Sequence, residues 1–191
     1  MTYPNWFEMT ARANFERYLL NYRAGLQNFT ALQIGAYVGH ATEWMTDNVL
    51  RSGDVLYDVD TWEGSDEAAH HAMDWVDVGR DYFERTAAAI NDGRVVMHCE
   101  SSDEFFSMYD RHALFDFVYV DGDHTEAQVY RDACNAWPLV KVGGIMAFDD
   151  YTWGEGLPME QRPKRAIDRF LAEAEDYRVL CCNAQVWVVK T

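Results

Sequence analysis

The sequence predicts an α/β protein built on a doubly wound parallel sheet, with helices on both faces and an extra helix at the N-terminus. Three observations predict this class. Short apolar runs rich in β-branched residues alternate five times with segments of helical periodicity, which is typical of parallel strands joined by right-handed crossovers. A glycine-containing turn follows the first run. Two further apolar runs end the chain and indicate a closing antiparallel hairpin.

The leading helix is expected over residues 5–27, where apolar side chains recur at helical spacing after a proline. We treat residues 1–29 as a helical extension to a core over residues 30–191, together forming one domain. Apolar runs predict strands over residues 31–34, 55–59, 94–98, 115–120 and 144–148. Helical periodicity predicts helices over residues 40–50, 79–91, 102–112 and 125–140. A loop over residues 151–163 then precedes a last helix around 166–171 and hairpin strands over 177–182 and 185–189.

Composition narrows the choice of partner and compartment. The formal net charge of −16 gives a surface potential that repels nucleic-acid phosphates and anionic lipids, so neither is an expected partner. The four cysteines have neither zinc-ligand spacing nor the density of a disulfide scaffold. The N-terminus lacks a basic region followed by an apolar stretch. We therefore expect a cytoplasmic protein.

The glycine turn is the first candidate ligand site. Gly35 and Gly39 lie four residues apart where the first strand turns into the first helix, and glycine there lets the backbone approach a ligand beside free helical N–H groups. The spacing lacks the three-glycine dinucleotide pattern and the Gly-Lys-Ser/Thr of a P-loop, so a ligand without phosphates fits better. A tight turn with no ligand remains the alternative.

An acidic residue follows at the end of the second strand. In such folds a carboxylate at this position binds ribose hydroxyls. Asp60 is the first candidate for this role, and Asp58 is the second.

These features belong to a larger resemblance. Residues 33–39, 60–64, 115–124 and 141–151 look like consecutive motifs of class I S-adenosylmethionine-dependent methyltransferases, in the same order and spacing. Within that superfamily they resemble the small metal-dependent O-methyltransferase branch that includes macrocin O-methyltransferase-like and cephalosporin-hydroxylase-like proteins. The resemblance runs from about residue 30 to the end. It implies a Rossmann-like sheet of about seven strands, mostly parallel with the last strand antiparallel, and S-adenosylmethionine as cofactor.

The resemblance also implies a set of cofactor-binding residues. Gln33 stands where the family usually has an acid that organises the methionine end of the cofactor, so it keeps a hydrogen bond while losing a charge. Trp62 is placed to stack on adenine, with ordinary core packing as the alternative. The full expected set is Gln33, Gly35, Tyr37, Gly39, Asp60, Trp62, Ser101, Ser102 and Asp121.

Three carboxylates are expected to converge beside the cofactor. Asp121 closes the fourth strand, and Asp149 and Asp150 close the fifth, so all three lie at the carboxyl edge of the sheet. Uncompensated, they would repel one another, and a divalent cation would relieve the repulsion. Oxygen ligands favour Mg²⁺, Mn²⁺ or Ca²⁺ over zinc, and the family resemblance places metal ligands at these positions. The alternative is that the aspartates cap helices and turns.

His124 and Asp149 are the candidate catalytic residues. His124 follows the Asp121-Gly122-Asp123 turn and has a suitable pKa for a general base, although it could instead cap the next helix. Asp149 would be the base in the absence of metal. Residues 64–78, with His70, either form a lid over the acceptor or begin a helix. Tyr151 and Trp153 are candidate walls of the acceptor pocket.

The resulting hypothesis is O-methylation of a hydroxylated small molecule with help from Mg²⁺ or another divalent cation. One alternative is metal-independent methylation of nitrogen or carbon. Others are a metal-dependent hydrolase or hydroxylase-like enzyme and a non-catalytic adenosyl-binding protein. The resemblance further implies a possible homodimer through the N-terminal helix. The sequence leaves the acceptor unidentified.

Overall fold

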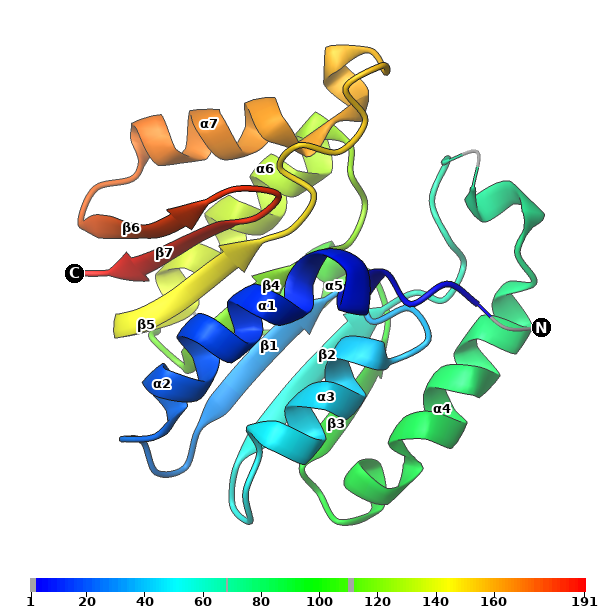
Figure 1. Cartoon of the computed structure of the whole chain (residues 1–191), viewed down its shortest axis with the longest axis vertical. Helices are drawn as coiled ribbons and strands as arrows, with labels where there is room; N and C mark the ends of the chain where they lie inside the picture. Colours follow the sequence, from blue (N-terminus) through cyan, green and yellow to red (C-terminus); the bar gives the residue numbers. More distant parts are fainter. Residues whose placement is uncertain (1–2, 68, 110–111) are drawn as a thin grey trace.

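The computed structural model describes residues 3–67, 69–109 and 112–191. Its centre is a seven-stranded sheet with the strand order β3-β2-β1-β4-β5-β7-β6 (Figure 1). Strands β1 to β5 are parallel, whereas β7 runs antiparallel to both β5 and β6. The predicted Rossmann-like sheet with an antiparallel last strand is therefore confirmed. The strands are β1 (Thr30–Ile34), β2 (Val55–Asp60), β3 (Val95–Cys99), β4 (Phe115–Val120), β5 (Val140–Phe148), β6 (Tyr177–Cys182) and β7 (Val186–Lys190).

Helices cover both faces of the sheet (Figure 1). An N-terminal helical segment packs on one face together with α3 (His40–Asn48) and α4 (Trp75–Asn91), and α5 (Ser102–Ser107), α6 (Glu126–Ala136) and α7 (Pro163–Glu173) pack on the other. The N-terminal segment alternates π-helical and α-helical turns, as η1 (Phe7–Ala11), α1 (Arg12–Asn14), η2 (Phe15–Leu19) and α2 (Leu20–Arg23). Short 3₁₀ turns are η3 (His70–Ala72), η4 (Trp137–Leu139) and η5 (Met159–Gln161).

The N-terminal segment is part of the core. The ring of Phe15 packs edge to face against Phe117, Tyr119 and Trp187, with centroid distances of 5.6, 5.0 and 5.1 Å. These three rings come from β4 and β7, so the apolar face of the N-terminal segment packs against the sheet of the same chain. Burial of such aromatic side chains is a main source of stability in a domain of this size.

Several predicted boundaries were wrong. The helix expected to reach residue 140 ends at Ala136, because Pro138 occupies the following 3₁₀ turn and β5 begins at Val140 rather than at 144. Helix α4 begins at Trp75 rather than 79, since the Asp74 side chain accepts hydrogen bonds from the amides of Val76 and Asp77. Helix α5 ends at Ser107, and residues 110 and 111 of the helix predicted over 102–112 lie outside the described residues.

A buried carboxyl group on β2 makes stability depend on pH. Asp58 is fully buried and accepts hydrogen bonds from Thr42 Oγ1 and Tyr82 OH on Oδ2, both at 2.7 Å. Burial raises its pKa from 3.8 to about 7, although both hydrogen bonds act in the opposite direction. The folded protein therefore keeps a proton that the unfolded chain loses above about pH 4.

We expect the free energy of unfolding to fall between about pH 4 and pH 7 by on the order of 4 kcal/mol through Asp58. Asp58→Asn cannot ionise and still offers an oxygen to Thr42 and Tyr82, so its stability should change less over the same interval. Urea unfolding of both proteins at pH 4 and pH 7 measures the difference. Equal pH dependence in the two proteins would contradict the assignment.

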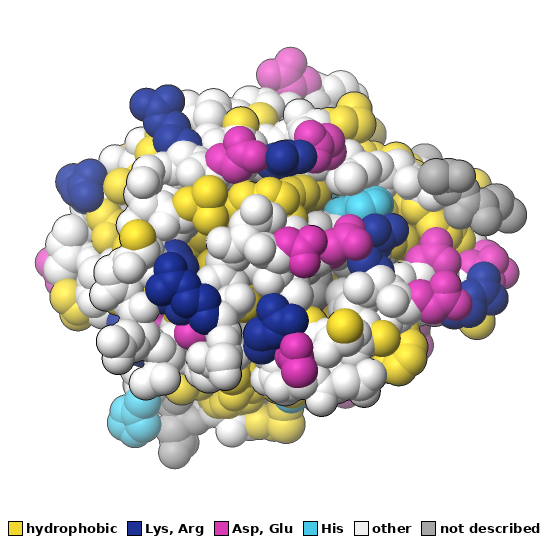
Figure 2. Space-filling view, turned by 60° about the horizontal axis from the view of Figure 1, so that its bottom comes forward, with side chains coloured by type: hydrophobic (Ala, Val, Ile, Leu, Met, Phe, Trp, Pro, Cys, Tyr) yellow, Lys and Arg dark blue, Asp and Glu magenta, His cyan; other side chains and the backbone are white. Residues whose placement is uncertain are grey.

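The surface carries charges of both signs. On the face in Figure 2, Lys and Arg side chains are scattered and several have Asp or Glu next to them.

Within the described residues, none of the helices combines the length and apolar character needed to cross a bilayer.

Candidate active site

A cavity of about 520 Å³ lies where the carboxyl ends of β1, β2, β4 and β5 meet the N-terminal helical segment. This is the edge at which open α/β sheets bind ligands. Residues that sequence reasoning had proposed contribute to its lining, namely Gln33, Gly35, Tyr37, Asp60, Ser101, Ser102, Asp121, His124, Asp149 and Asp150. Residues that it had missed also contribute, among them Trp6, Thr10, Glu67, Gln128 and Asp132.

The glycine turn packs against the end of β4 more tightly than any side chain would allow. Gly35 has φ of +84°, and a Cβ at this position would lie 2.0 Å from the backbone oxygen of Asp121. Its amide donates a 2.8 Å hydrogen bond to the carbonyl of Val59, which ties the turn to β2 as well. Gly39 has φ of +83° and precedes α3. The sequence therefore needs glycine at 35 for space as well as for conformation.

Asp60 holds the turn in shape. Its Oδ2 accepts hydrogen bonds from the amides of Ala36 and Tyr37, at 2.8 and 2.9 Å, and its Oδ1 accepts from the amide of Trp62 at 2.8 Å. Asp60 also lines the cavity. Asp58, the second candidate, is completely buried behind it.

Gln33 presents an unpaired oxygen at the same place. The side chain is 1% exposed, and Nε2 donates to the carbonyl of Gly35 at 3.0 Å. Its Oε1 is buried and accepts no hydrogen bond from the described residues, and Gln33 lines the cavity. A buried, unpaired acceptor is unfavourable, so this atom is suited to receive a hydrogen bond from a ligand.

Trp62 lies in the core behind the turn, which is the alternative that the sequence had left open. Its ring packs on Tyr82 with centroids 4.7 Å apart, and Nε1 donates to the carbonyl of Tyr37 at 2.8 Å. Tyr37 lines the cavity instead, and its ring stacks on the ring of Trp6 with centroids 4.7 Å apart. Burial raises the pKa of Tyr37 to about 12.

Ser101 and Ser102 begin α5 and differ in their roles. Ser101 forms a capping box with Glu104. Ser102 Oγ donates to Asp132 Oδ1 at 2.6 Å, and Gln128 Nε2 donates to both of these oxygens at 3.0 Å. The signal for Asp132 was present in the sequence, because it shares a buried helical face with Val129, Ala133 and Ala136 and is the acidic member of an otherwise apolar set.

The carboxylate cluster forms at the ends of β4 and β5. Asp121, His124 and Asp150 each offer one ligand atom, and these atoms all lie within 4.8 Å of one another. Burial raises the pKa of Asp121 well above its usual value, and the charges of Asp149 and Asp150 raise it further. Asp149 is held apart from this group. Its Oδ2 accepts a hydrogen bond from the Tyr119 hydroxyl, and its Oδ1 accepts one from the Asp150 amide at 2.7 Å.

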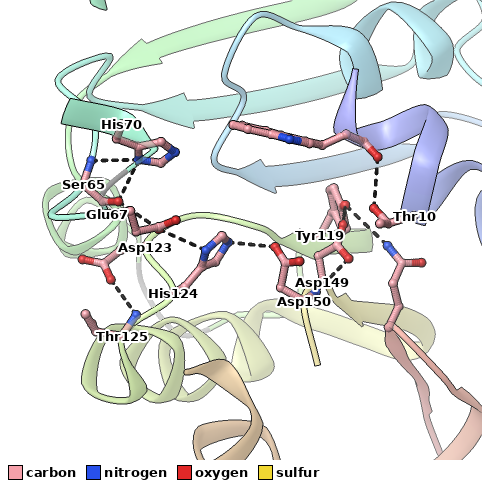
Figure 3. Close-up of polar contacts among 12 residues, drawn as sticks. Thr10, Ser65, Glu67, His70, Tyr119, Asp123, His124, Thr125, Asp149 and Asp150 are labelled. Atoms are coloured by element: carbon pink, nitrogen blue, oxygen red, sulfur yellow. Dashed lines mark hydrogen bonds and ion pairs between the residues drawn. The ribbon is translucent and has the colours of Figure 1, made fainter. Parts of the chain in front are cut away.

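His124 lies between two carboxylates, as Figure 3 shows. Its Nε2 is 2.9 Å from Asp150 Oδ2, and its Nδ1 is 3.0 Å from Glu67 Oε1. Burial alone would lower the pKa of His124, but the hydrogen bonds and charges of Asp150 and Glu67 raise it well above the usual value. The structure therefore favours the protonated imidazole here, which offsets part of the negative charge of the cluster.

Segments above the sheet complete the cavity. Glu67 belongs to the stretch 64–78, where the Ser65 hydroxyl contacts both Glu67 Oε1 and His70 Nδ1, at 2.9 and 2.8 Å. From the other side Trp153 approaches the His124 ring, with centroids 4.7 Å apart. Tyr151, expected as a second wall, instead pairs through its hydroxyl with Asp168 at 2.7 Å, outside the cavity lining.

The family of the chain follows from comparison with known proteins. Residues 32–151 match the family described as "Methyltransferase domain", and this match covers more than half of the chain. The protein therefore belongs to the methyltransferase-domain family. Comparison with curated proteins gave no match.

Solved structures share the fold at low sequence identity. The O-methyltransferase TomG from Streptomyces achromogenes, involved in tomaymycin synthesis and solved with S-adenosylmethionine, is 19% identical with a TM-score of 0.67, over 95% of this chain and 81% of that one. An O-methyltransferase from Bacillus cereus, solved with S-adenosylhomocysteine, is 18% identical with a TM-score of 0.65, over 100% and 83%. A Clostridium thermocellum protein, named as a candidate rRNA methylase, is 14% identical with a TM-score of 0.67, over 100% of both chains. Such likeness establishes the fold and leaves the substrate open.

Proposed function

We propose that the protein is an S-adenosylmethionine-dependent O-methyltransferase that acts on a hydroxylated small molecule. The observation that carries the proposal is one cavity that joins the Gly35 turn and Asp60 to the cluster of Asp121, His124 and Asp150. The first part suits an adenosyl compound and the second part suits an acceptor with neighbouring oxygens. Solved proteins of the same fold, TomG and the Bacillus cereus enzyme among them, carry this cofactor or its demethylated product.

The residues around the turn fit the cofactor. Gln33 Oε1 accepts no hydrogen bond within the described part of the chain, and the ammonium group of a methionine moiety is a donor that would supply one. Asp60 ends β2 at the cavity and would accept from ribose hydroxyls. Gly35 lines the cavity, and its close packing on the backbone of Asp121 fixes the position of the turn beside the ligand. Bound S-adenosylmethionine supplies a methyl group that is already activated by the positive charge on sulfur.

The carboxylate cluster fits a divalent cation. Asp121 and Asp150 bring carboxylate oxygens, the ligands that Mg²⁺ and Mn²⁺ prefer, and a nitrogen of His124 lies within 4.8 Å of them. Asp149, the third ligand that the resemblance implies, lines the same cavity with both oxygens engaged, and we keep it in the proposed set. A bound cation would hold two oxygens of the acceptor and lower the pKa of the hydroxyl.

The side chains around the cluster would contribute in two further ways, by positioning the acceptor and by accepting its proton. Trp153 and Glu67 fix the ring of His124 from two sides, so the imidazole stays at the cluster. His124 can act as the general base only where Asp149, rather than the imidazole, completes the ligand set. It must then be unprotonated, and positive charge brought to the cluster by bound ligands opposes its protonated form. The aromatic rings of Trp6 and Trp153 line the cavity and would exclude water from the acceptor.

Methyl transfer can be tested without knowledge of the natural acceptor. The protein is incubated with trideuteromethyl-labelled S-adenosylmethionine and a panel of vicinal diols, such as 3,4-dihydroxybenzoate, alongside matched amines and mono-hydroxy compounds. Mass spectrometry should find label in diols when Mg²⁺ is present and none after chelation. Label in amines, or transfer that persists after chelation, would instead support the metal-independent alternative.

A further inference from the structure

A buried chain of hydrogen bonds runs from the N-terminal helical segment to the carboxylate cluster. Asn14 Nδ2 donates to Gln185 Oε1 at 2.8 Å, and Gln185 Nε2 donates to the Tyr119 hydroxyl at 3.5 Å. The Tyr119 hydroxyl in turn donates to Asp149 Oδ2 (Figure 3). Asp149 lines the cavity, whereas the other three residues lie outside its lining. The chain therefore reaches the site from the core of the protein.

The direction of the hydrogen bonds in this chain is fixed by the groups around Gln185. Its Oε1 accepts from Asn14 Nδ2 and also from Trp187 Nε1, the second at 2.9 Å. The other end of the amide, Nε2, must then face Tyr119. Because the Tyr119 oxygen accepts from this nitrogen, its own proton is directed to Asp149. Tyr119 and Gln185 are 1% and 0% exposed, so water does not compete for these groups.

Asp149 transmits this constraint to Asp150. Its Oδ1 accepts the amide of Asp150 at 2.7 Å, and Asp150 has the left-handed φ of +56°. This backbone conformation is unfavourable for a residue with a side chain and persists only where the surroundings hold it. With this backbone, Asp150 Oδ2 lies 2.9 Å from His124 Nε2. Rotation of the Asp149 carboxylate would release the amide and allow Asp150 to leave the cluster.

We propose that Tyr119 is a positioning residue for the cation site, because its hydroxyl fixes the Asp149 carboxylate and, through it, the direction of Asp150. Gln185 keeps the Tyr119 hydroxyl turned toward Asp149. This inference rests on the proposed function and adds to its cation site two residues from outside the cavity lining. Residues that hydrogen-bond to the ligands of a metal ion set the orientation of those ligands and so affect metal affinity.

The test is Mn²⁺ binding to Tyr119→Phe, measured by electron paramagnetic resonance of the free ion. Phenylalanine keeps the ring, which packs against Phe15 with centroids 5.0 Å apart, and removes only the hydroxyl. Mn²⁺ affinity should fall roughly tenfold to a hundredfold. Calorimetric titration with S-adenosylhomocysteine in metal-free buffer should give the wild-type affinity, since Tyr119 does not line the cavity.

Gln185→Met provides a second, independent variant. It keeps the Tyr119 hydroxyl and removes the nitrogen that donates to it. The hydroxyl can then turn away from Asp149 for part of the time. Mn²⁺ affinity should fall by about threefold to tenfold, less than in Tyr119→Phe, because the bond to the ligand is weakened rather than lost.

Tyr82→Phe is the matched control. Tyr82 is also buried, and its hydroxyl donates to a buried carboxylate, Asp58 Oδ2, at 2.7 Å. This pair lies outside the carboxylate cluster. The variant should lose stability in urea unfolding, as Tyr119→Phe does, because each leaves a buried carboxylate without one of its donors. Its Mn²⁺ affinity should equal that of the wild-type protein.

The outcomes separate the inference from the proposed function. Wild-type Mn²⁺ affinity in folded Tyr119→Phe would overturn the inference, as would a loss in Tyr82→Phe equal to that in Tyr119→Phe. If Tyr119→Phe does not fold, wild-type affinity in Gln185→Met overturns the inference instead. Absence of Mn²⁺ binding to the wild-type protein would overturn the cation site of the proposed function, and the inference with it.

Discussion

Gly35→Ala is expected to abolish binding of S-adenosylhomocysteine and to lower the free energy of unfolding by on the order of 3 kcal/mol. The reason is steric, because a Cβ at this position would lie 2.0 Å from the backbone oxygen of Asp121. The turn and the end of β4 must then separate. Both border the cavity. Their separation would therefore break the hydrogen bonds between Asp60 and the turn and would also move Asp121. Calorimetric titration and urea unfolding measure the two effects.

Gly93→Ala is the matched control for backbone conformation. Gly93 has φ of +81°, close to the +84° of Gly35, but a Cβ there would meet nothing within 4 Å. This variant should lose about 1 kcal/mol of stability from the left-handed conformation alone and should bind the ligand normally. Equal loss of stability in the two variants, or normal binding by Gly35→Ala, would contradict the steric account.

The second large effect concerns the carboxylate cluster. Asp121→Asn and Asp150→Asn are expected to weaken Mn²⁺ binding more than roughly a hundredfold, because each removes a charged ligand while keeping the side-chain shape. Asparagine is the right substitute at 150, where φ is +56° and asparagine tolerates that conformation. Electron paramagnetic resonance of free Mn²⁺ during a titration gives the affinity directly.

Asp123→Asn separates a ligand effect from a general effect of charge. Asp123 lines the same cavity, and its Oδ1 accepts the amide of Thr125 at 2.7 Å, outside the group of Asp121, His124 and Asp150. Mn²⁺ affinity in this variant should fall by only a few-fold. Loss as severe as in Asp121→Asn would show that the cation responds to overall charge rather than to the proposed ligands. The same titration of Asp149→Asn and His124→Ala shows which of the two completes the ligand set.

The sheet was predictable from sequence because its signals are local. Alternating apolar runs and helical periodicity depend on residues near one another, and the glycine turn follows directly from Gly35 and Gly39. Boundaries failed where a single side chain decides them. The Asp74 cap extends α4 at its start, and Pro138 interrupts the helical periodicity that predicts one continuous helix before β5.

The site was predictable where residues end strands or follow them within a few positions. Asp60, Asp121 and Asp150 could be placed at the cavity because the topology brings strand ends together. Glu67 and Trp6 could not, since their positions depend on how a loop and the N-terminal segment fold back over the sheet. Nothing in the local sequence indicates that Glu67 meets His124 across the cavity. Trp62 shows the converse case, a residue at a strand end that turns into the core.

The central claim is that the cavity at the Gly35 turn holds an adenosyl ligand beside a cation site. Calorimetric titration of S-adenosylhomocysteine into the wild-type protein, with and without Mg²⁺, tests this most directly. The structure predicts saturable binding to one site per chain in both conditions, because Gln33 and Asp60 lie outside the carboxylate cluster. Absence of saturable binding in both conditions would contradict the methyltransferase proposal and leave only the fold and the family match established.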